Sequence, residues 1–134
     1  MFDTDTVSFF MRDNPKGVRV NVAKHNKDGF CISAITYAEL MFGLKRNYSK
    51  QLDLWLHEIL DKFKVIVFDE SSSVIYGEIR AVLEKSGISL DNTDMLIAAS
   101  ALAVGAVLVS HNTKHFSKIN GIKVEDWCKT GKIM

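Results

Sequence analysis

The strongest constraint on the fold is an alternation of short apolar runs with longer amphipathic segments along the chain. Short apolar runs suit buried strands, and the amphipathic segments between them suit helices that connect parallel strands. We expect strands at residues 30–32, 65–68, 106–109 and 122–124, with Met1 and Phe2 as the stub of a first strand. The pattern predicts an α/β fold with three α/β/α layers, in which helices flank a central parallel sheet of about four to five short strands.

Helical spacing of apolar residues supports the connecting segments. It is found at Ile35, Ala38 and Phe42, and again within residues 52–63, 74–83 and 96–102. Ser71, Ser72 and Ser73 offer N-caps for the third of these helices, and Asn92 or Thr93 can cap the fourth. These segments should pack on the sheet as amphipathic helices.

Length and charge limit the class of protein. A chain of 134 residues fits one domain, and we expect residues 1–134 to form it. The net charge of +1 gives no attraction of the whole molecule to nucleic acid, so any such binding must come from local clusters of charge. No apolar run approaches the roughly 18 residues that cross a bilayer, and the start of the chain is acidic, unlike a secretory signal. We expect a cytoplasmic protein with no membrane contact.

Polar residues follow several of the expected strands. Asp3 follows the first strand, Glu39 lies one to two helical turns after the strand that ends at Ile32, and Asn112 follows the strand that ends at Val109. Asp94 begins the helix that leads into this last strand. In an open parallel sheet, ligands bind beyond the carboxyl ends of the strands. We therefore expect these four residues at one edge of the sheet.

Two of these carboxylates share a helical face with apolar residues. Glu39 lines up with Ile35, Ala38 and Phe42, and Asp94 lines up with residues 97, 98, 101 and 102, so both are expected on the core side. Each has a simpler interpretation. Asp94 can be a first-turn acid favoured by the helix dipole, and Glu39 can be a solvated edge residue.

The expected position of Glu39 and Asp94 beside Asp3 favours a metal-binding site over these simpler interpretations. Three neighbouring carboxylates raise one another's pKa unless a cation neutralises them. With oxygen ligands only, the expected ion is Mg²⁺, or Mn²⁺ as an alternative.

Four motifs resemble one known family, the PIN domains of VapC type. They are, in order, residues 2–5 (FDTD), 32–43 (ISAITYAELMFG), 92–101 (NTDMLIAASA) and 108–112 (LVSHN), the last followed by Phe116, Gly121, Ile122 and residues 125–127 (EDW). Each motif alone is weak, whereas four in the same order and at matching separations are specific. The resemblance covers nearly the whole chain.

The resemblance implies a Mg²⁺-dependent endoribonuclease, the toxin of a toxin–antitoxin pair, which inhibits translation by cleaving RNA, with tRNA as a candidate. It implies a catalytic set of Asp3, Glu39, Asp94 and Asn112, with the metal held by Asp3 and Asp94. It also implies an antitoxin of VapB type as partner, a homodimer and a toxin–antitoxin hetero-oligomer.

The candidates for a supporting role, which is to position waters or carboxylates, are Asp5, Ser33, Thr36 and Thr93. Each of the three hydroxyls can equally be a helix cap. Many relatives carry Asp at the position of Asn112, and Asn or Ser at that of Asp5. An amide oxygen is the weaker ligand, so this difference predicts lower metal affinity.

Two other functions compete with the nuclease. Residues 3–6 (DTDT) look like the opening motif of haloacid-dehalogenase-type phosphatases, but the later paired-acid motif and room for a cap domain are missing. A non-catalytic module with the same fold is the other alternative. His111 and His115 have the spacing of a helical metal pair, but we expect solvated or locally hydrogen-bonded side chains there, without a third soft ligand nearby.

Overall fold

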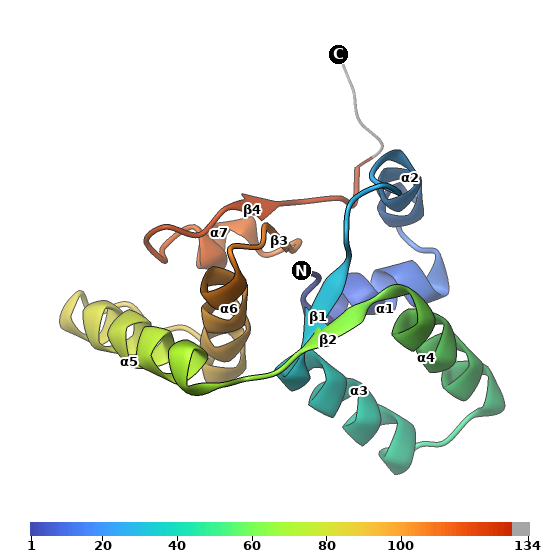
Figure 1. Cartoon of the computed structure of the whole chain (residues 1–134), viewed down its shortest axis with the longest axis horizontal. Helices are drawn as coiled ribbons and strands as arrows, with labels where there is room; N and C mark the ends of the chain where they lie inside the picture. Colours follow the sequence, from blue (N-terminus) through green and yellow to red (C-terminus); the bar gives the residue numbers. More distant parts are fainter. Residues whose placement is uncertain (130–134) are drawn as a thin grey trace.

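Residues 1–129 are described by the structure, a computed structural model. The helices of this part are α1 (Thr4–Arg12), α2 (Gly17–Lys24), α3 (Ala34–Arg46), α4 (Lys50–Lys62), α5 (Glu70–Lys85), α6 (Asn92–Val104) and α7 (Thr113–Phe116) (Figure 1). The strands are β1 (Cys31–Ser33), β2 (Lys64–Ile66), β3 (Leu108–Val109) and β4 (Val124–Glu125). The expected alternation of strands and helices is confirmed, and α2 and α7 are two short helices that the apolar spacing did not reveal.

The first residues of the chain join two strand pairs into one parallel arrangement. β1 pairs with β2 and β3 pairs with β4, and Phe2 bridges in parallel to both Ile32 and Val109. Phe2 N donates to Cys31 O at 3.0 Å, and Asp3 N donates to Val109 O at 3.1 Å. The order is therefore β2, β1, the Met1–Phe2 stub, β3 and β4, and all the pairings are parallel, as the sequence predicted for the sheet.

β1 has the expected three residues, shifted by one, whereas β2, β3 and β4 are shorter than expected, and β2 shows why. Ile66 pairs with Ser33, which is the last residue of β1 because α3 begins at Ala34. Val67 and Phe68 consequently have no strand beside them, and Val67 is exposed. Residues 106 and 107 likewise precede the paired part of β3.

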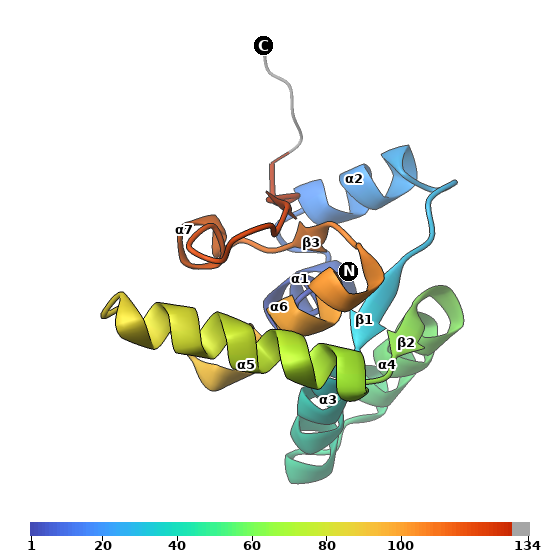
Figure 2. The same ribbon diagram turned by 60° about the vertical axis from the view of Figure 1, so that its left-hand side comes forward.

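Two apolar clusters lie on opposite faces of this sheet, which gives the three layers. The first core contains Met1, Leu108 and Phe116 together with the facing side chains of α5 and α6. The second core contains Phe2, Val109 and Trp127 together with side chains of α1, α2 and α4. Met1 and Phe2 belong to different cores because successive residues of a strand point to opposite faces. Figure 2 shows α5 and α6 on one side of the strands.

Two expected helix starts are wrong. α5 begins at Glu70 with Asp69 as its N-cap, before the three serines, and Asp69 Oδ1 accepts from Ser72 N at 3.0 Å. α6 is capped by Asp91, whose Oδ1 accepts from Thr93 N at 2.8 Å. Aspartate caps as well as serine or asparagine, and Asp69 and Asp91 each precede the capping residues that we expected.

The expected face of α3 is also wrong. Ala38 and Phe42 are exposed, whereas Thr36 and Leu44 are buried, so the face that packs inward lies to one side of the predicted stripe. The matching stripe on α6 is confirmed, because Ile97, Ala98 and Ala101 are buried. Among residues 1–129, no helix is long and apolar enough to cross a membrane.

Candidate active site

A polar cleft of about 250 Å³ lies at the carboxyl edge of the central strands. Its lining residues are Asp3, Thr4, Asp5, Glu39, Asp91, Thr93, Asp94, Ile97 and Asn112. All four residues expected at this edge, together with Asp5 and Thr93, are therefore brought together. Five of the lining side chains are carboxylates, and they come from three separate stretches of the chain.

Asp3 is the most enclosed of these acids, being only 4% exposed. It caps α1, where its Oδ1 accepts from Thr6 N at 2.9 Å, and its Oδ2 accepts from the Ser110 hydroxyl at 2.6 Å. Burial raises the pKa of Asp3 above its ordinary value, although the hydrogen bonds from Ser110 and Thr6 oppose the rise. Each oxygen has a second lone pair that a cation can share.

Asp94 lies in the first turn of α6 and is half-buried beside Ile97. Burial, followed by the charges of Asp91, Asp3 and Asp5, raises its pKa from 3.8 to about 6. A first-turn acid that only served the helix dipole would have its pKa lowered. Burial, together with the neighbouring carboxylates, therefore destabilises the charged form of Asp94 more than the dipole stabilises it.

Glu39 reaches the cleft from the exposed side of α3, not from the core side that the sequence suggested. The Thr4 hydroxyl contacts both Glu39 Oε1 and the Thr36 hydroxyl, the latter at 3.2 Å. Thr36 is completely buried, so this chain of polar contacts connects Glu39 to the interior. Thr36 thus supports Thr4 and, through it, Glu39.

Asn112 lines the cleft from the segment that links β3 to α7. Its side chain makes no capping bond to α7, whereas its backbone N–H donates to Ser110 Oγ at 2.9 Å. Ser110 therefore touches both Asp3 and Asn112, and it fixes the spacing of the two segments. The amide of Asn112 can offer its oxygen to the cleft.

Ser33 is the supporting residue that the structure places elsewhere. It is buried, it caps α3, and its Oγ accepts from Thr36 N at 3.1 Å, but it does not line the cleft. Its role here is the helix cap that the sequence left open. Thr93 lines the cleft and donates its backbone N–H to Asp91.

Sequence reasoning missed three residues of this neighbourhood. They are Asp91, which lines the cleft and adds to the repulsion on Asp94; Ser110, which binds Asp3; and Thr4, which binds Glu39. Asp91 had a readable signal, because an acid three residues before another at a helix start is an N-cap beside a first-turn acid. Ser110 and Thr4 have none, since their roles depend on contacts with residues far along the chain.

The donor set fits a hard divalent cation. Among residues 1–129, those that line the cleft supply carboxylate, amide and hydroxyl oxygens and include no lysine or arginine. Mg²⁺ prefers such oxygen ligands, and a bound ion would favour the charged forms of Asp3 and Asp94, whose pKa values are raised first by burial and then by neighbouring carboxylates.

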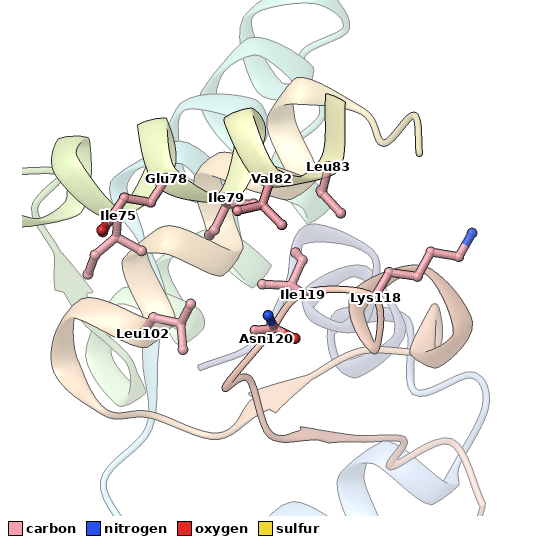
Figure 3. A pocket seen from close by; sticks show the side chains of 9 residues that line it. All are labelled: Ile75, Glu78, Ile79, Val82, Leu83, Leu102, Lys118, Ile119 and Asn120. Atoms are coloured by element: carbon pink, nitrogen blue, oxygen red, sulfur yellow. The ribbon is translucent and has the colours of Figure 1, made fainter. Parts of the chain in front are cut away.

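A second groove is largely apolar. It lies between α5, α6 and the segment after α7, has a volume of about 250 Å³, and is lined largely by aliphatic side chains such as Ile75, Ile79 and Leu102 (Figure 3). Only Glu78, Lys118 and Asn120 add polar atoms. Figure 3 shows no set of polar side chains that converges in this groove, so the chemistry belongs to the acidic cleft.

His111 and His115, which the sequence spaced as a possible metal pair, have different surroundings in the structure. His111 Nδ1 lies 2.9 Å from Asp126 Oδ2, whereas His115 is exposed on α7 and its charge counteracts the raised pKa of Asp94. Both side chains are solvated, as expected, but the hydrogen-bond partner of His111 lies 15 residues away along the chain and is not a local one. The expected absence of a third soft ligand is wrong, because Cys128 lies close to His111 and Asp126.

Comparison with known proteins agrees with this architecture. Residues 1–122 match the model of the PIN domain. The chain is 33% identical over 129 residues to the tRNA(fMet)-specific endonuclease VapC of Salmonella typhimurium, covering 96% of this chain and 97% of that protein.

Solved structures of relatives have the same fold as this chain. VapBC2 from Rickettsia felis, bound to a DNA fragment from its promoter, superposes with a TM-score of 0.87 at 32% identity, covering 95% of this chain and 97% of the other. VapBC-1 from nontypeable Haemophilus influenzae superposes with a TM-score of 0.84 at 30% identity, covering 96% and 98%. The chain therefore belongs to the PIN-domain family and, within it, to the VapC ribonucleases.

Proposed function

We propose that this chain is a Mg²⁺-dependent endoribonuclease that uses the acidic cleft to cleave tRNA, and that it is the toxin of a VapBC-type pair. The observation that carries the proposal is the convergence of five carboxylates and the Asn112 amide in one cleft without a lysine or arginine in its lining, within residues 1–129. Such a cleft is suited to bringing a phosphate and a divalent ion together. Mn²⁺ is the alternative ion, because it shares this preference for oxygen ligands.

Asp3 and Asp94 would hold the ion, with Asn112 beside them. When bound, the ion polarises the scissile phosphate and lowers the pKa of a water for in-line attack. Asp3 keeps its orientation through Thr6 and Ser110. Glu39, oriented by Thr4, is placed to accept a proton from the attacking water. Asp5 and Thr93 position the neighbouring groups from the rim.

The proposed substrate follows from the relative in Salmonella typhimurium, which is named for tRNA(fMet). Contacts to the RNA backbone need exposed cations outside the cleft. Exposed lysines and arginines outside the cleft are available at residues 45, 46 and 50 and at residues 114, 118 and 123. These contacts recognise shape more than sequence.

The proposed partner is an antitoxin of VapB type, because the two solved relatives described above are VapBC complexes. Large apolar side chains are exposed on and near α3 and α4, among them Phe42, Tyr48 and Leu54. Exposed apolar side chains of this size are candidate contacts for a protein partner. We further propose a single domain over residues 1–134, a homodimer within the hetero-oligomer and a cytoplasmic location.

The test is cleavage of purified tRNA by the full chain, with Mg²⁺ and with chelator. Asp3→Asn, Glu39→Gln and Asp94→Asn should each lower the rate by a factor of about 100 or more, as expected when groups that stabilise transition-state charge are removed. Asp53→Asn, on α4 outside the cleft, is the matched control. Wild-type rates in any two of the three cleft variants would refute the assignment.

The rival functions differ in this assay. Membership of the PIN family argues against the phosphatase, whose later motifs the chain also lacks. A non-catalytic module would bind Mg²⁺ without RNA turnover under any condition. Cleavage of an unstructured RNA oligonucleotide at the same rate as tRNA would contradict the proposed substrate class alone.

A further inference from the structure

A second group of potential metal ligands lies outside the acidic cleft. His111, Asp126 and Cys128 each present one ligand atom, and these three atoms lie within 4.8 Å of one another. His111 comes from the segment after β3, whereas Asp126 and Cys128 follow β4. None of the three lines the acidic cleft. The fold thus brings a nitrogen donor together with oxygen and sulfur donors that lie 15 or more residues further along the chain.

The segment that carries two of these ligands is held rigidly. Asn21 Nδ2 donates to the carbonyl oxygens of Trp127 and Lys129, at 3.1 and 2.8 Å. Trp127 is buried, and its indole stacks on His25 with ring centroids 4.5 Å apart. The direction of the chain through Asp126 and Cys128 is therefore fixed before any ligand binds.

Gly17 shows how closely this segment is packed. A Cβ at Gly17 would lie 2.1 Å from the carbonyl oxygen of Cys128, so α2 admits only glycine there. This contact holds the Cys128 backbone against the start of α2. Such support reduces the ordering that a bound ion would have to impose on its ligands.

The side chains are oriented as a ligand set requires. Asp126 Oδ1 accepts from Cys128 N at 2.9 Å, which leaves Oδ2 directed at His111 Nδ1, 2.9 Å away. Zinc bonds of about 2.0 to 2.3 Å in a tetrahedron place neighbouring ligand atoms roughly 3.3 to 3.6 Å apart. The exposed His111 ring can make this small adjustment.

A reactive thiol is the competing interpretation of Cys128. Its partial burial and the neighbouring Asp126 raise the pKa of this thiol to about 12, which suppresses the nucleophilic thiolate at neutral pH. A divalent ion would offset the charge of Asp126, and the thiol would release its proton to solvent on binding. The neighbourhood is thus unsuited to nucleophilic chemistry without an ion.

We propose that His111, Asp126 and Cys128 form a binding site for a zinc-class transition-metal ion, separate from the Mg²⁺ cleft. Mixed nitrogen, sulfur and oxygen ligands select such ions over Mg²⁺, and three protein ligands leave one tetrahedral position for water. The ion would link the segments after β3 and β4. It would thereby restrain Ser110 and Asn112, the neighbours of His111 that reach the catalytic cleft.

The test uses the full chain, freed of metal with a chelator and kept in excess Mg²⁺ so that the acidic cleft is saturated. Co²⁺ is added as the spectroscopic probe, and Zn²⁺ affinity is measured by competition. We expect one equivalent of Co²⁺ to produce a thiolate charge-transfer band. Cys128→Ser should abolish the band, and His111→Ala should weaken Zn²⁺ binding by a factor of at least about 10, the loss seen even for outer partners of a ligand.

Two controls isolate the site. Cys31→Ser removes the other cysteine, and His115→Ala removes the neighbouring histidine, so both variants should keep the band and the Zn²⁺ affinity. Asp94→Asn should also keep the band, which shows that the ion is not in the acidic cleft. A wild-type chain without the band, or equal losses in Cys31→Ser and Cys128→Ser, would overturn the proposal.

Discussion

Phe2 and Asp3 are adjacent in the sequence but belong to regions with opposite energetics. Phe2 is 1% exposed and lies in the second core, with its ring edge-on to Phe10, Phe63 and Trp127. Asp3 is nearly as enclosed but faces other carboxylates, and its pKa is raised by burial. The aromatic cluster stabilises the fold whatever the solution contains. The acidic cleft destabilises the metal-free fold, so its stability should depend on pH and on divalent ions.

The contrast between the aromatic cluster and the acidic cleft indicates where the functional site lies. A buried aromatic ring contributes several kcal/mol through apolar area and packing. Like charges in a partly enclosed cleft reduce stability unless a ligand neutralises them. A protein keeps such a cleft only where activity requires it. Each prediction below therefore compares the response of one region with that of the other.

The largest effect is expected in the aromatic cluster. Phe63→Ala removes a ring whose centroid lies 4.9 Å from that of Phe2 and 5.5 Å from that of Phe30. We expect a loss of about 3–5 kcal/mol in the free energy of unfolding. Urea denaturation measures it. Phe42→Ala is the control, because Phe42 is exposed and should cost far less. Mg²⁺ should raise the free energy of unfolding of Phe63→Ala and of wild type by equal amounts. Loss of the Mg²⁺ response in Phe63→Ala would contradict the independence of the aromatic cluster and the acidic cleft.

Ser110 connects the cleft to the interior, and its removal should have an intermediate effect. Ser110→Ala leaves Asp3 Oδ2 without its 2.6 Å hydrogen bond in a buried setting, at an expected cost of about 1–3 kcal/mol. The pKa of Asp3 should rise further and Mg²⁺ affinity should fall. Calorimetry and urea denaturation check both changes. Ser117→Ala is the control, since its hydroxyl bonds only to the exposed Lys114 carbonyl; equal effects in both would contradict the role of Ser110.

The pH dependence follows from Asp94. Its folded pKa of about 6 exceeds its ordinary value of 3.8, so the folded protein binds more protons between these values and loses stability as the pH rises through them. The loss should be about 1–2 kcal/mol after allowance for the half-exposed side chain. Urea denaturation of metal-free wild type and Asp94→Asn should agree near pH 4 and diverge by pH 7. Identical pH profiles of stability for the two proteins would show that the cleft does not raise the pKa of Asp94.

Asn112 offers the smallest expected effect. Asn112→Asp replaces the amide with a carboxylate, and we expect Mg²⁺ affinity to rise by a factor of about 10, because one added ligand charge strengthens a hard-ion site. Calorimetric titration measures the change. Asn120→Asp, in the apolar groove, should leave affinity unchanged. Unchanged or weaker binding in Asn112→Asp would remove Asn112 from the ion site.

The sequence predicted the layers and the place of the cleft because both depend on periodicity and strand ends. The apolar runs around Ile32 and Val109 identified the central strands, and Asp3, Glu39 and Asp94 were placed at their carboxyl edge. The face of α3 could not be predicted correctly. Ala38 and Phe42 fit a helical stripe, but the strand-to-helix connection at Ser33 turns that stripe toward solvent.

Long-range contacts explain the rest of what sequence reasoning missed. Ser110 and Asp3 are 107 residues apart, and His111 meets Asp126 only because β4 pairs with β3. No local pattern encodes such a meeting. By contrast, Asp69 and Asp91 as helix caps were readable in principle, because aspartate is among the preferred capping residues.

We claim that a divalent ion relieves charge repulsion in the acidic cleft, and thermal melting of wild type and Asp94→Asn measures this effect. Without metal at pH 7, Asp94→Asn should melt at a higher temperature than wild type, because one repelling charge is gone. With Mg²⁺, wild type should gain stability through binding to the folded state while the variant gains little. Glu70→Gln, a first-turn acid of α5 outside the cleft, is the matched control and should keep the wild-type response to Mg²⁺. If Asp94→Asn instead melts lower than wild type and responds normally to Mg²⁺, Asp94 is a structural helix-start acid and the claim is wrong.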